Sequence, residues 1–173
     1  MGTCMWCRGL MPPPGESSLS SRPMWRPATP DDDEAIETLC LALYTEDPGP
    51  EPMTVERVQR TLTALREWPA RGCAAALELD GRVQGYALLV AFWSNEYGGE
   101  VCIVDELYVS AAARGGGHGS RLLSELAAGR GPWPGQPAAV QLEVRPDNAR
   151  ARALYERLGF TSKNLLLRLP PTR

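Results

Sequence analysis

The sequence predicts a single α/β domain in which the strands form one mixed sheet, with helices on both of its faces. Two observations lead to this fold class. Apolar residues recur with periods of about 2 and 3.6 residues, in the order β-α-α-β-β-β-α-β-α-β. A glycine-rich turn at residues 114–119 also lies between a strand pattern and an amphipathic helix pattern. The 173 residues suffice for one domain with a sizeable core.

Two helices are predicted in the first half of the domain. Thr29-Pro30-Asp31 supplies a capping hydroxyl, a proline at the first helical position and an acid in the first turn. The apolar residues that follow at helical spacing predict a buried face, formed by Ile36, Leu39, Cys40 and Leu43. After a proline-rich acidic loop at residues 44–52, Thr54 is expected to cap the second helix. Its inner face is predicted to carry Val55, Val58, Leu62 and Leu65.

Strand patterns dominate the second half. Residues 73–79 and 82–92 form a pair joined by Asp80-Gly81, which is typical of a tight hairpin. A turn-rich connection at residues 93–100 leads into the central strand at residues 101–109. A helix is predicted from about residue 118, with Leu122, Leu123 and Leu126 on one side, and it is followed by a loop at 129–137 and a strand at 138–144. The last elements are a helix at 148–158 and a strand or strand pair at 160–169. The inward face of that helix is predicted to carry Ala151, Leu154, Tyr155 and Leu158.

Composition argues against several function classes. A net charge of −3 gives no reason to expect binding to nucleic acid or to an anionic membrane surface. No apolar run approaches the ~20 residues that span a bilayer, and we expect no secretory signal. Cys40, Cys73 and Cys102 fall in apolar patterns and are expected as reduced core residues of a cytoplasmic protein. Nothing supports a metal site. Residues 1–23 lack periodicity and are expected to form a flexible or peripheral tail before the domain at 24–173.

The motif RGGGHG at residues 114–119 has the character of a phosphate-binding loop. Glycines let the backbone approach an anion closely, and unpaired N–H groups at a helix N-terminus point toward it. The spacing is neither the dinucleotide fingerprint nor a P-loop, because no Gly-Lys-Ser/Thr follows. Arg114, Gly117 and Gly119 match Arg-x-x-Gly-x-Gly, and here the sequence resembles the GNAT superfamily of acetyl-CoA-dependent N-acetyltransferases. The alternative, a flexible glycine linker, is disfavoured because strand and helix flank the loop without a gap.

A second motif, NARARALYERLGF at residues 148–160, is similar to the family's Asn-x-x-Ala-x-x-Leu-Tyr-Glu-x-x-Gly-Phe. Asn148 can cap its helix and also offer its amide to a ligand. The resemblance implies that Tyr155 lies near the coenzyme sulfur and donates a proton to the leaving thiolate. The alternative for Tyr155 is a packed aromatic whose hydroxyl reaches a backbone carbonyl.

The resemblance covers the chain from about residue 24 to its end. It implies the GNAT (acyl-CoA N-acyltransferase) fold, with a twisted, mostly antiparallel central sheet and an opening strand at residues 24–28. The only histidine, His118, lies inside the phosphate loop and is not expected to act as a base. The residues expected to bind acetyl-CoA are Leu107, Tyr108, Val109, Arg114, Gly115, Gly116, Gly117, His118, Gly119, Ser120 and Asn148.

The expected chemistry is direct attack of an amine on the thioester, because no Ser/His/Asp or Cys/His arrangement is visible. The backbone N–H of Leu107 or Val109 is expected to stabilise the oxyanion. Asp105 and Glu106 lie where the central strand passes the acetyl group in relatives, and one of them is expected to accept the amine's proton. Strand alternation points one into the cleft and the other away, but a bulge here would change the parity. The choice stays open, and both residues can also be solvated carboxylates at a sheet end.

The acceptor is expected to be a primary amine. A small cationic amine suits the acids and aromatics of the two loops that border the expected acceptor site, namely Glu46, Asp47, Glu51, Glu96 and Glu100 with Tyr44, Trp93 and Tyr97. The region around residues 92–109 is also similar to diamine and polyamine acetyltransferases. The alternatives are a peptide N-terminus or lysine, and a non-catalytic acetyl-CoA-binding module. A homodimer is left open.

Overall fold

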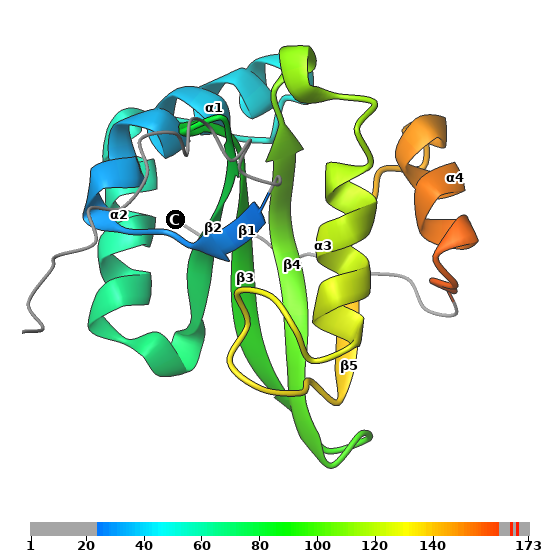
Figure 1. The fold of residues 1–173 in the computed structure, drawn as a ribbon. Coiled ribbons are helices and arrows are strands. Elements are labelled where there is room, and N and C mark those ends of the chain that lie inside the picture. Colours follow the sequence, from blue (N-terminus) through cyan, green and yellow to red (C-terminus); the bar gives the residue numbers. More distant parts are fainter. Residues whose placement is uncertain (1–23, 163–166, 168, 170–173) are drawn as a thin grey trace, which may run out of the picture.

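Five strands form one sheet in the order β1-β2-β3-β4-β5 (Figure 1). The computed structural model describes residues 24–162, 167 and 169. The strands are β1 (Met24–Pro27), β2 (Gly72–Leu79), β3 (Arg82–Ser94), β4 (Gly99–Val109) and β5 (Ala139–Leu142). Neighbouring strands are antiparallel except β4 and β5, which run parallel. This confirms the predicted mixed, mostly antiparallel sheet.

The helices cover both faces of the sheet, as predicted (Figure 1). They are α1 (Asp33–Glu46), α2 (Val55–Glu67), α3 (His118–Ala127) and α4 (Ala149–Arg157). On one face, α1 and α2 bury Ile36, Leu39, Cys40, Val58, Leu62 and Leu65 against Tyr86, Leu88 and Tyr108. On the other face, α3 buries Leu122, Leu123 and Leu126 against Trp25, Ala75, Leu77, Ala87, Leu89, Cys102 and Val104. Each fully buried leucine contributes about 1.5–3 kcal/mol, so these two cores hold the helices on the sheet.

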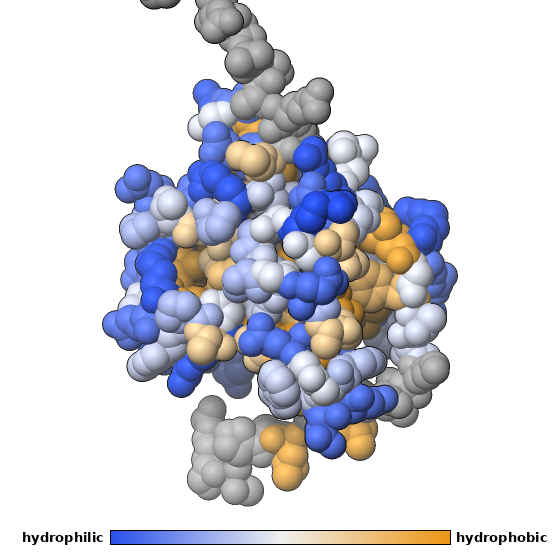
Figure 2. Space-filling model, turned by 60° about the horizontal axis from the view of Figure 1, so that its bottom comes forward, coloured by the Kyte–Doolittle hydropathy of each residue, from blue (hydrophilic) through white to orange (hydrophobic). Residues whose placement is uncertain are grey.

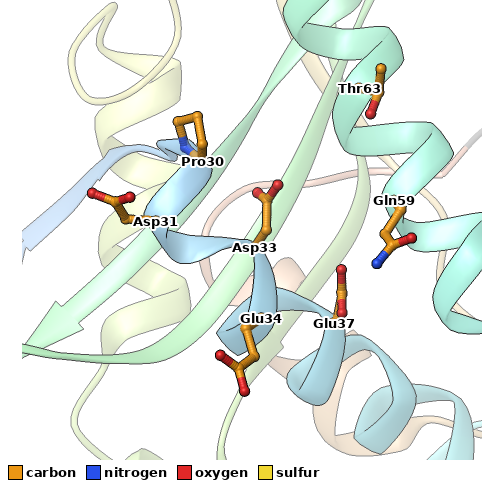
Figure 3. A pocket seen from close by; sticks show the side chains of 7 residues that line it. All are labelled: Pro30, Asp31, Asp33, Glu34, Glu37, Gln59 and Thr63. Carbon is orange, nitrogen blue, oxygen red and sulfur yellow. The ribbon is translucent and has the colours of Figure 1, made fainter.

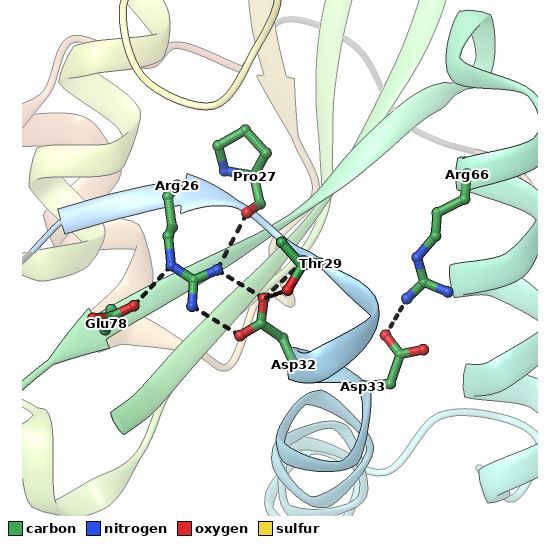
Figure 4. A network of polar contacts seen from close by, with 7 residues as sticks. All are labelled: Arg26, Pro27, Thr29, Asp32, Asp33, Arg66 and Glu78. Atoms are coloured by element: carbon green, nitrogen blue, oxygen red, sulfur yellow. Dashed lines mark hydrogen bonds and ion pairs between the residues drawn. The ribbon is translucent and has the colours of Figure 1, made fainter. Parts of the chain in front are cut away.

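The first helix begins later than the sequence predicts. A 3-10 turn, Pro30–Asp32, precedes α1, because the Asp32 carboxylate folds back and accepts hydrogen bonds from the Thr29 backbone N–H at 2.7 Å and the Thr29 hydroxyl at 3.1 Å. Arg26 of β1 donates two hydrogen bonds to the same carboxylate, at 2.7 and 2.8 Å, and one to Glu78 of β2 at 2.8 Å (Figure 4). This network fastens the start of α1 to the first two strands.

The hairpin between β3 and β4 is longer than predicted. Pairing of β3 with β4 continues to Trp93 with Glu100 and Ser94 with Gly99. The pairing of β3 with β2 ends earlier, at Val90. The aromatic side chains of Phe92, Trp93 and Tyr97 on this ribbon are about half exposed or more. The predicted hairpin between β2 and β3 is confirmed. Its two turn residues, Asp80 and Gly81, have φ values of 49° and 73°, which the tight turn requires.

The C-terminal elements differ from prediction mainly in length. β5 covers residues 139–142 rather than 138–144. Asn148 caps α4 as predicted, because its side-chain oxygen accepts a hydrogen bond from the Ala151 N–H at 3.1 Å. Residues 160–162 form no strand, and the rest of the predicted last strand lies outside the described residues except for positions 167 and 169. Residues 1–23 lie outside them as well.

The surface and the cysteines agree with a folded domain. In the view of Figure 2, hydrophilic residues cover most of the face, with smaller hydrophobic areas showing between them. Cys40 and Cys102 are buried, Cys73 is partly buried, and all three are free thiols. Within the described part of the chain, no helix has the length and apolar character needed to cross a membrane.

Candidate functional site

A groove of about 740 Å³ runs past the C-terminal end of β4, between the end of α1, the N-terminus of α3 and one side of α4. Most of the predicted site residues line it. From the predicted set, these are Leu107, Tyr108, Val109, Arg114, Gly115, Gly117, His118, Gly119, Ser120, Asn148 and Tyr155. Gly116, Asp105 and Glu106 are not among its walls.

The glycine loop, residues 114–119, leaves the N-terminus of α3 open to the groove. Gly115 and Gly117 have φ values of 90° and 74°, a left-handed backbone that other residues rarely adopt. A side chain at either position would meet no atom within 4 Å, so free space lies above both. The first N–H groups of α3 have no partner within the helix. A small anion such as a phosphate fits this geometry.

A buried tryptophan fixes this helix start. Trp25 of β1 is only 4% exposed, and its indole N–H donates a 2.9 Å hydrogen bond to the carbonyl oxygen of His118. The His118 ring in turn lies against Gly116, where an added Cβ would come within 2.5 Å of Nε2. His118 therefore belongs to the structure of the loop. The sequence analysis found the loop but gave no sign of the contact with Trp25.

Two ion pairs join the end of α1 to the loops on the other side of the groove. Arg114 pairs with Glu46 at 2.7 Å, and its Nε donates to the Val109 carbonyl at 2.9 Å. The Tyr108 hydroxyl also donates to Glu46 at 2.7 Å, and this bond together with Arg114 lowers the pKa of Glu46. Arg145 pairs with Asp47 at 3.0 Å. Two of the five acids that the sequence analysis placed at an amine site, Glu46 and Asp47, therefore face arginines instead.

Tyr155 of α4 lines the groove and is part of the predicted site. Burial of the side chain raises its pKa, and its ring packs 5.8 Å from the ring of Phe160. In the part of the chain that the structure describes, no group accepts a hydrogen bond from this hydroxyl. The alternative in which Tyr155 is held by a backbone carbonyl therefore finds no support there.

A β-bulge lies at Asp105. Leu88 pairs with Glu106 and Leu89 with Val104, so Asp105 is an extra residue with no partner on β3. Val104 packs in the core under α3, and strict alternation would place Glu106 on that same face. The bulge shifts the parity, so that Glu106 lies on the face covered by α1. Asp105 itself is exposed.

Beyond the bulge, two backbone N–H groups of β4 have no partner among the described strands. Ser110 donates to Gln84 of β3 at 2.8 Å, and N–H groups alternate in direction along a strand. The N–H groups of Leu107 and Val109 therefore point away from β3. β5 pairs with β4 only over residues 101–104, so no described strand accepts from them. Both N–H groups are therefore free of strand pairing at the groove, where the sequence analysis predicted an oxyanion donor.

The Glu106 carboxylate is held by three neutral donors. Tyr44 of α1 donates to Oε1 at 2.7 Å, Tyr86 of β3 donates to Oε2 at 2.6 Å, and the Cys40 thiol lies 3.6 Å from Oε2. Burial and the neighbouring Glu106 raise the pKa of both tyrosines, so both stay protonated donors. The sequence analysis did not connect Tyr86 or Cys40 with Glu106. The only indication in the sequence was the hydroxyl of Tyr86 in an otherwise apolar strand.

The turn of the β3–β4 hairpin does not belong to this site. Glu100 precedes Glu106 by six residues on β4, which at ~3.3 Å per residue separates them by about 20 Å. Figure 1 shows this turn at the opposite end of β4 from the glycine loop. Glu96, Trp93 and Tyr97, which the sequence analysis placed near the acceptor, therefore lie far from the groove.

A second hollow, of about 580 Å³, lies between the start of α1 and the middle of α2 (Figure 3). It is lined by Pro30, Asp31, Asp33, Glu34, Glu37, Gln59 and Thr63. Acids in the first turn of a helix complement its dipole, and Asp33 also pairs with Arg66 of α2. We assign this hollow no function. Within the described ranges, no cluster of three or more His, Cys, Asp or Glu side chains could hold a metal ion.

Comparison with known proteins relates the chain to one family. The sequence model of the Acetyltransferase (GNAT) family matches residues 34–160. No curated protein matches the chain by sequence.

Solved structures share the fold. A possible acetyltransferase from Clostridium difficile 630 aligns with a TM-score of 0.73 at 18% identity, covering 87% of this chain and 98% of that one. A Trypanosoma brucei acetyltransferase aligns with a TM-score of 0.61 at 22% identity, over 87% and 100% of the two chains. The ribosomal-protein-alanine N-acetyltransferase of Brucella melitensis biovar Abortus 2308 gives 0.61 at 19%, over 86% and 100%.

Proposed function

The chain belongs to the GNAT acetyltransferase family, and from this we propose that it transfers an acetyl group from acetyl-CoA directly to a primary amine. One observation carries the proposal. A single groove brings together the open N-terminus of α3, Asn148, the Tyr155 hydroxyl and the unpaired backbone of β4 beyond the bulge. These parts are distant in sequence and supply what thioester aminolysis needs.

The proposed coenzyme site uses the glycine loop for the pyrophosphate. Open space lies above Gly117, and the N–H groups at the start of α3 bind the anion there. Arg150 and Arg157 also line the groove and make no ion pair with another described side chain, so they supply positive charge to it. Arg114 and Arg145 are already paired with acids, and they contribute to phosphate binding only if those pairs exchange.

The proposed reaction forms a C–N bond and breaks the C–S bond of the thioester. An unpaired N–H of Leu107 or Val109 stabilises the oxyanion of the tetrahedral intermediate. Tyr155 donates a proton to the departing thiolate, and a carboxylate at the bulge, Asp105 or Glu106, takes the proton that the amine loses. The positions of these groups at the groove or beside it support the assignment.

Calorimetry with acetyl-CoA tests the proposed coenzyme site through two variants of Gly117. Gly117→Glu places a carboxylate against the pyrophosphate and should abolish binding. Gly117→Ala is the matched control, because it imposes the same left-handed backbone on a side chain, at a cost of about 1 kcal/mol, without adding charge. A folded Gly117→Glu protein with wild-type affinity would refute the site.

Acetyl-CoA consumption across an amine panel tests the reaction. The panel includes alkylamines and polyamines, aminoglycosides, amino acids and peptides with a free N-terminus or lysine. Transfer to small cationic amines is the expected result, and transfer to peptides alone would establish the second acceptor class. Tight coenzyme binding with no acetylated product from any amine would leave a non-catalytic binding module.

A further inference from the structure

Glu106 carries a negative charge that no cation of the described chain neutralises. Its three donors, two hydroxyls and a thiol, are neutral, and none of the nine ion pairs among the described residues includes it. Asp105, the preceding residue on β4, also acts on Tyr44 through its charge, which has the same sign as that of Glu106. A partly buried carboxylate without a cation is costly, because the protein replaces only part of its hydration.

The donors leave one specific position open. A carboxylate offers about four acceptor positions, two on each oxygen. Tyr86 and Cys40 occupy both positions on Oε2, whereas Tyr44 occupies one on Oε1. One acceptor position on Oε1 therefore has no donor within the described chain.

The cluster lies beside the groove. Leu107 and Tyr108 follow Glu106 on β4 and line the groove, and Leu43 precedes Tyr44 on α1 and lines it as well. Tyr86 is fully buried and rigidly placed in the central sheet, while Tyr44 belongs to the last turns of α1. Each tyrosine thus holds one oxygen of the carboxylate.

We propose that Tyr44 and Tyr86 are positioning residues that hold Glu106 so that its open Oε1 position receives the acceptor as an ammonium cation. This inference rests on the proposed function and names the acceptor class. An alkylammonium N–H completes the fourth hydrogen bond and neutralises the charge. One proton then passes from nitrogen to Oε1, which leaves the neutral amine beside the acetyl group and the carboxyl to release the proton to water.

A double-mutant cycle tests the positioning role. The variants are Tyr86→Phe, Tyr44→Phe, Glu106→Gln and the two tyrosine variants combined with Glu106→Gln. Each tyrosine variant should lower kcat/KM for a cationic alkylamine by about tenfold, the scale of a hydrogen bond to a charged group. The dissociation constant for acetyl-CoA should not change. Once Gln stands at position 106, loss of either hydroxyl should have no further effect on kcat/KM.

The matched control is Ser110→Ala. It removes a hydroxyl that donates a 2.7 Å hydrogen bond to Gln84 between the same two strands but touches neither Glu106 nor the groove. This variant should keep the wild-type kcat/KM, which separates the cluster from general weakening of the sheet.

The outcomes distinguish this inference from the proposed function. Wild-type rates in both tyrosine variants, or losses that persist in full in the Glu106→Gln background, overturn the positioning role while leaving the acetyltransferase in place. A wild-type protein that acetylates no amine overturns both. If Tyr86→Phe does not fold, the partly exposed Tyr44 completes the test alone.

Discussion

Replacing Asp32 by Asn should destabilise the protein by about 2 kcal/mol at neutral pH. The carboxylate of Asp32 is 5% exposed and accepts hydrogen bonds from Arg26 and Thr29 (Figure 4). The Arg26 guanidinium is the largest cause that lowers the pKa of Asp32, from the ordinary 3.8 to about 2. One pKa unit corresponds to about 1.4 kcal/mol of preference for the charged form, so this lowering amounts to about 2 kcal/mol.

The pH dependence follows from the direction of this shift. Because the pKa is lower in the folded state than in the unfolded state, the stabilisation is fully present above the unfolded value of 3.8. It is lost as the pH falls from there through about 2. The difference in stability between wild type and Asp32→Asn should therefore be constant from pH 7 to about 5 and shrink toward pH 2.

Urea denaturation at several pH values measures this difference. Asp31→Asn is the control, because Asp31 is the exposed neighbour in the same turn and forms no ion pair with a described residue. Equal effects of the two variants, or a difference that grows as the pH falls from 5 to 3, would refute the reasoning from the ion pair.

Three further predictions concern the groove. Tyr155→Phe should lower kcat by ~100-fold, the scale of general acid catalysis, and leave the calorimetric affinity for acetyl-CoA unchanged; a wild-type rate with chemistry rate-limiting would make the hydroxyl purely structural. Asn148→Ala should cost about 1 kcal/mol in thermal unfolding, while Asn148→Asp, which keeps the cap, should cost less. Trp25→Phe should cost at least about 1 kcal/mol in urea, since it leaves the His118 carbonyl without its donor, and an unchanged midpoint would contradict that role.

The sequence predicted those features that depend on residues close together in the chain. Helix faces follow from apolar spacing, the cap of α4 from Asn148, and the tight hairpin from Asp80-Gly81. The glycine loop was found for the same reason, because its glycines and the helix start are contiguous.

Features that depend on a partner elsewhere in the chain were missed or left open. The sequence analysis allowed for a bulge near Asp105 but did not decide on it, because a bulge exists only in the pairing of β4 with β3. Glu46 and Asp47 look like a cation site until Arg114 and Arg145, about 70 and 100 residues away, are seen to face them. The hairpin turn looked close to the acceptor because the sequence does not show how far β3 and β4 extend beyond β2.

The bulge makes the site depend on the length of β4 as well as on its side chains. Leu88 and Leu89 are adjacent on β3 and pair with Glu106 and Val104, so a β4 strand without Asp105 is expected to keep both pairs. Deleting Asp105 would therefore straighten the strand while leaving both halves on their present faces, whereas Asp105→Asn would keep the bend and remove only the charge. A single codon is accordingly expected to decide whether this strand bends.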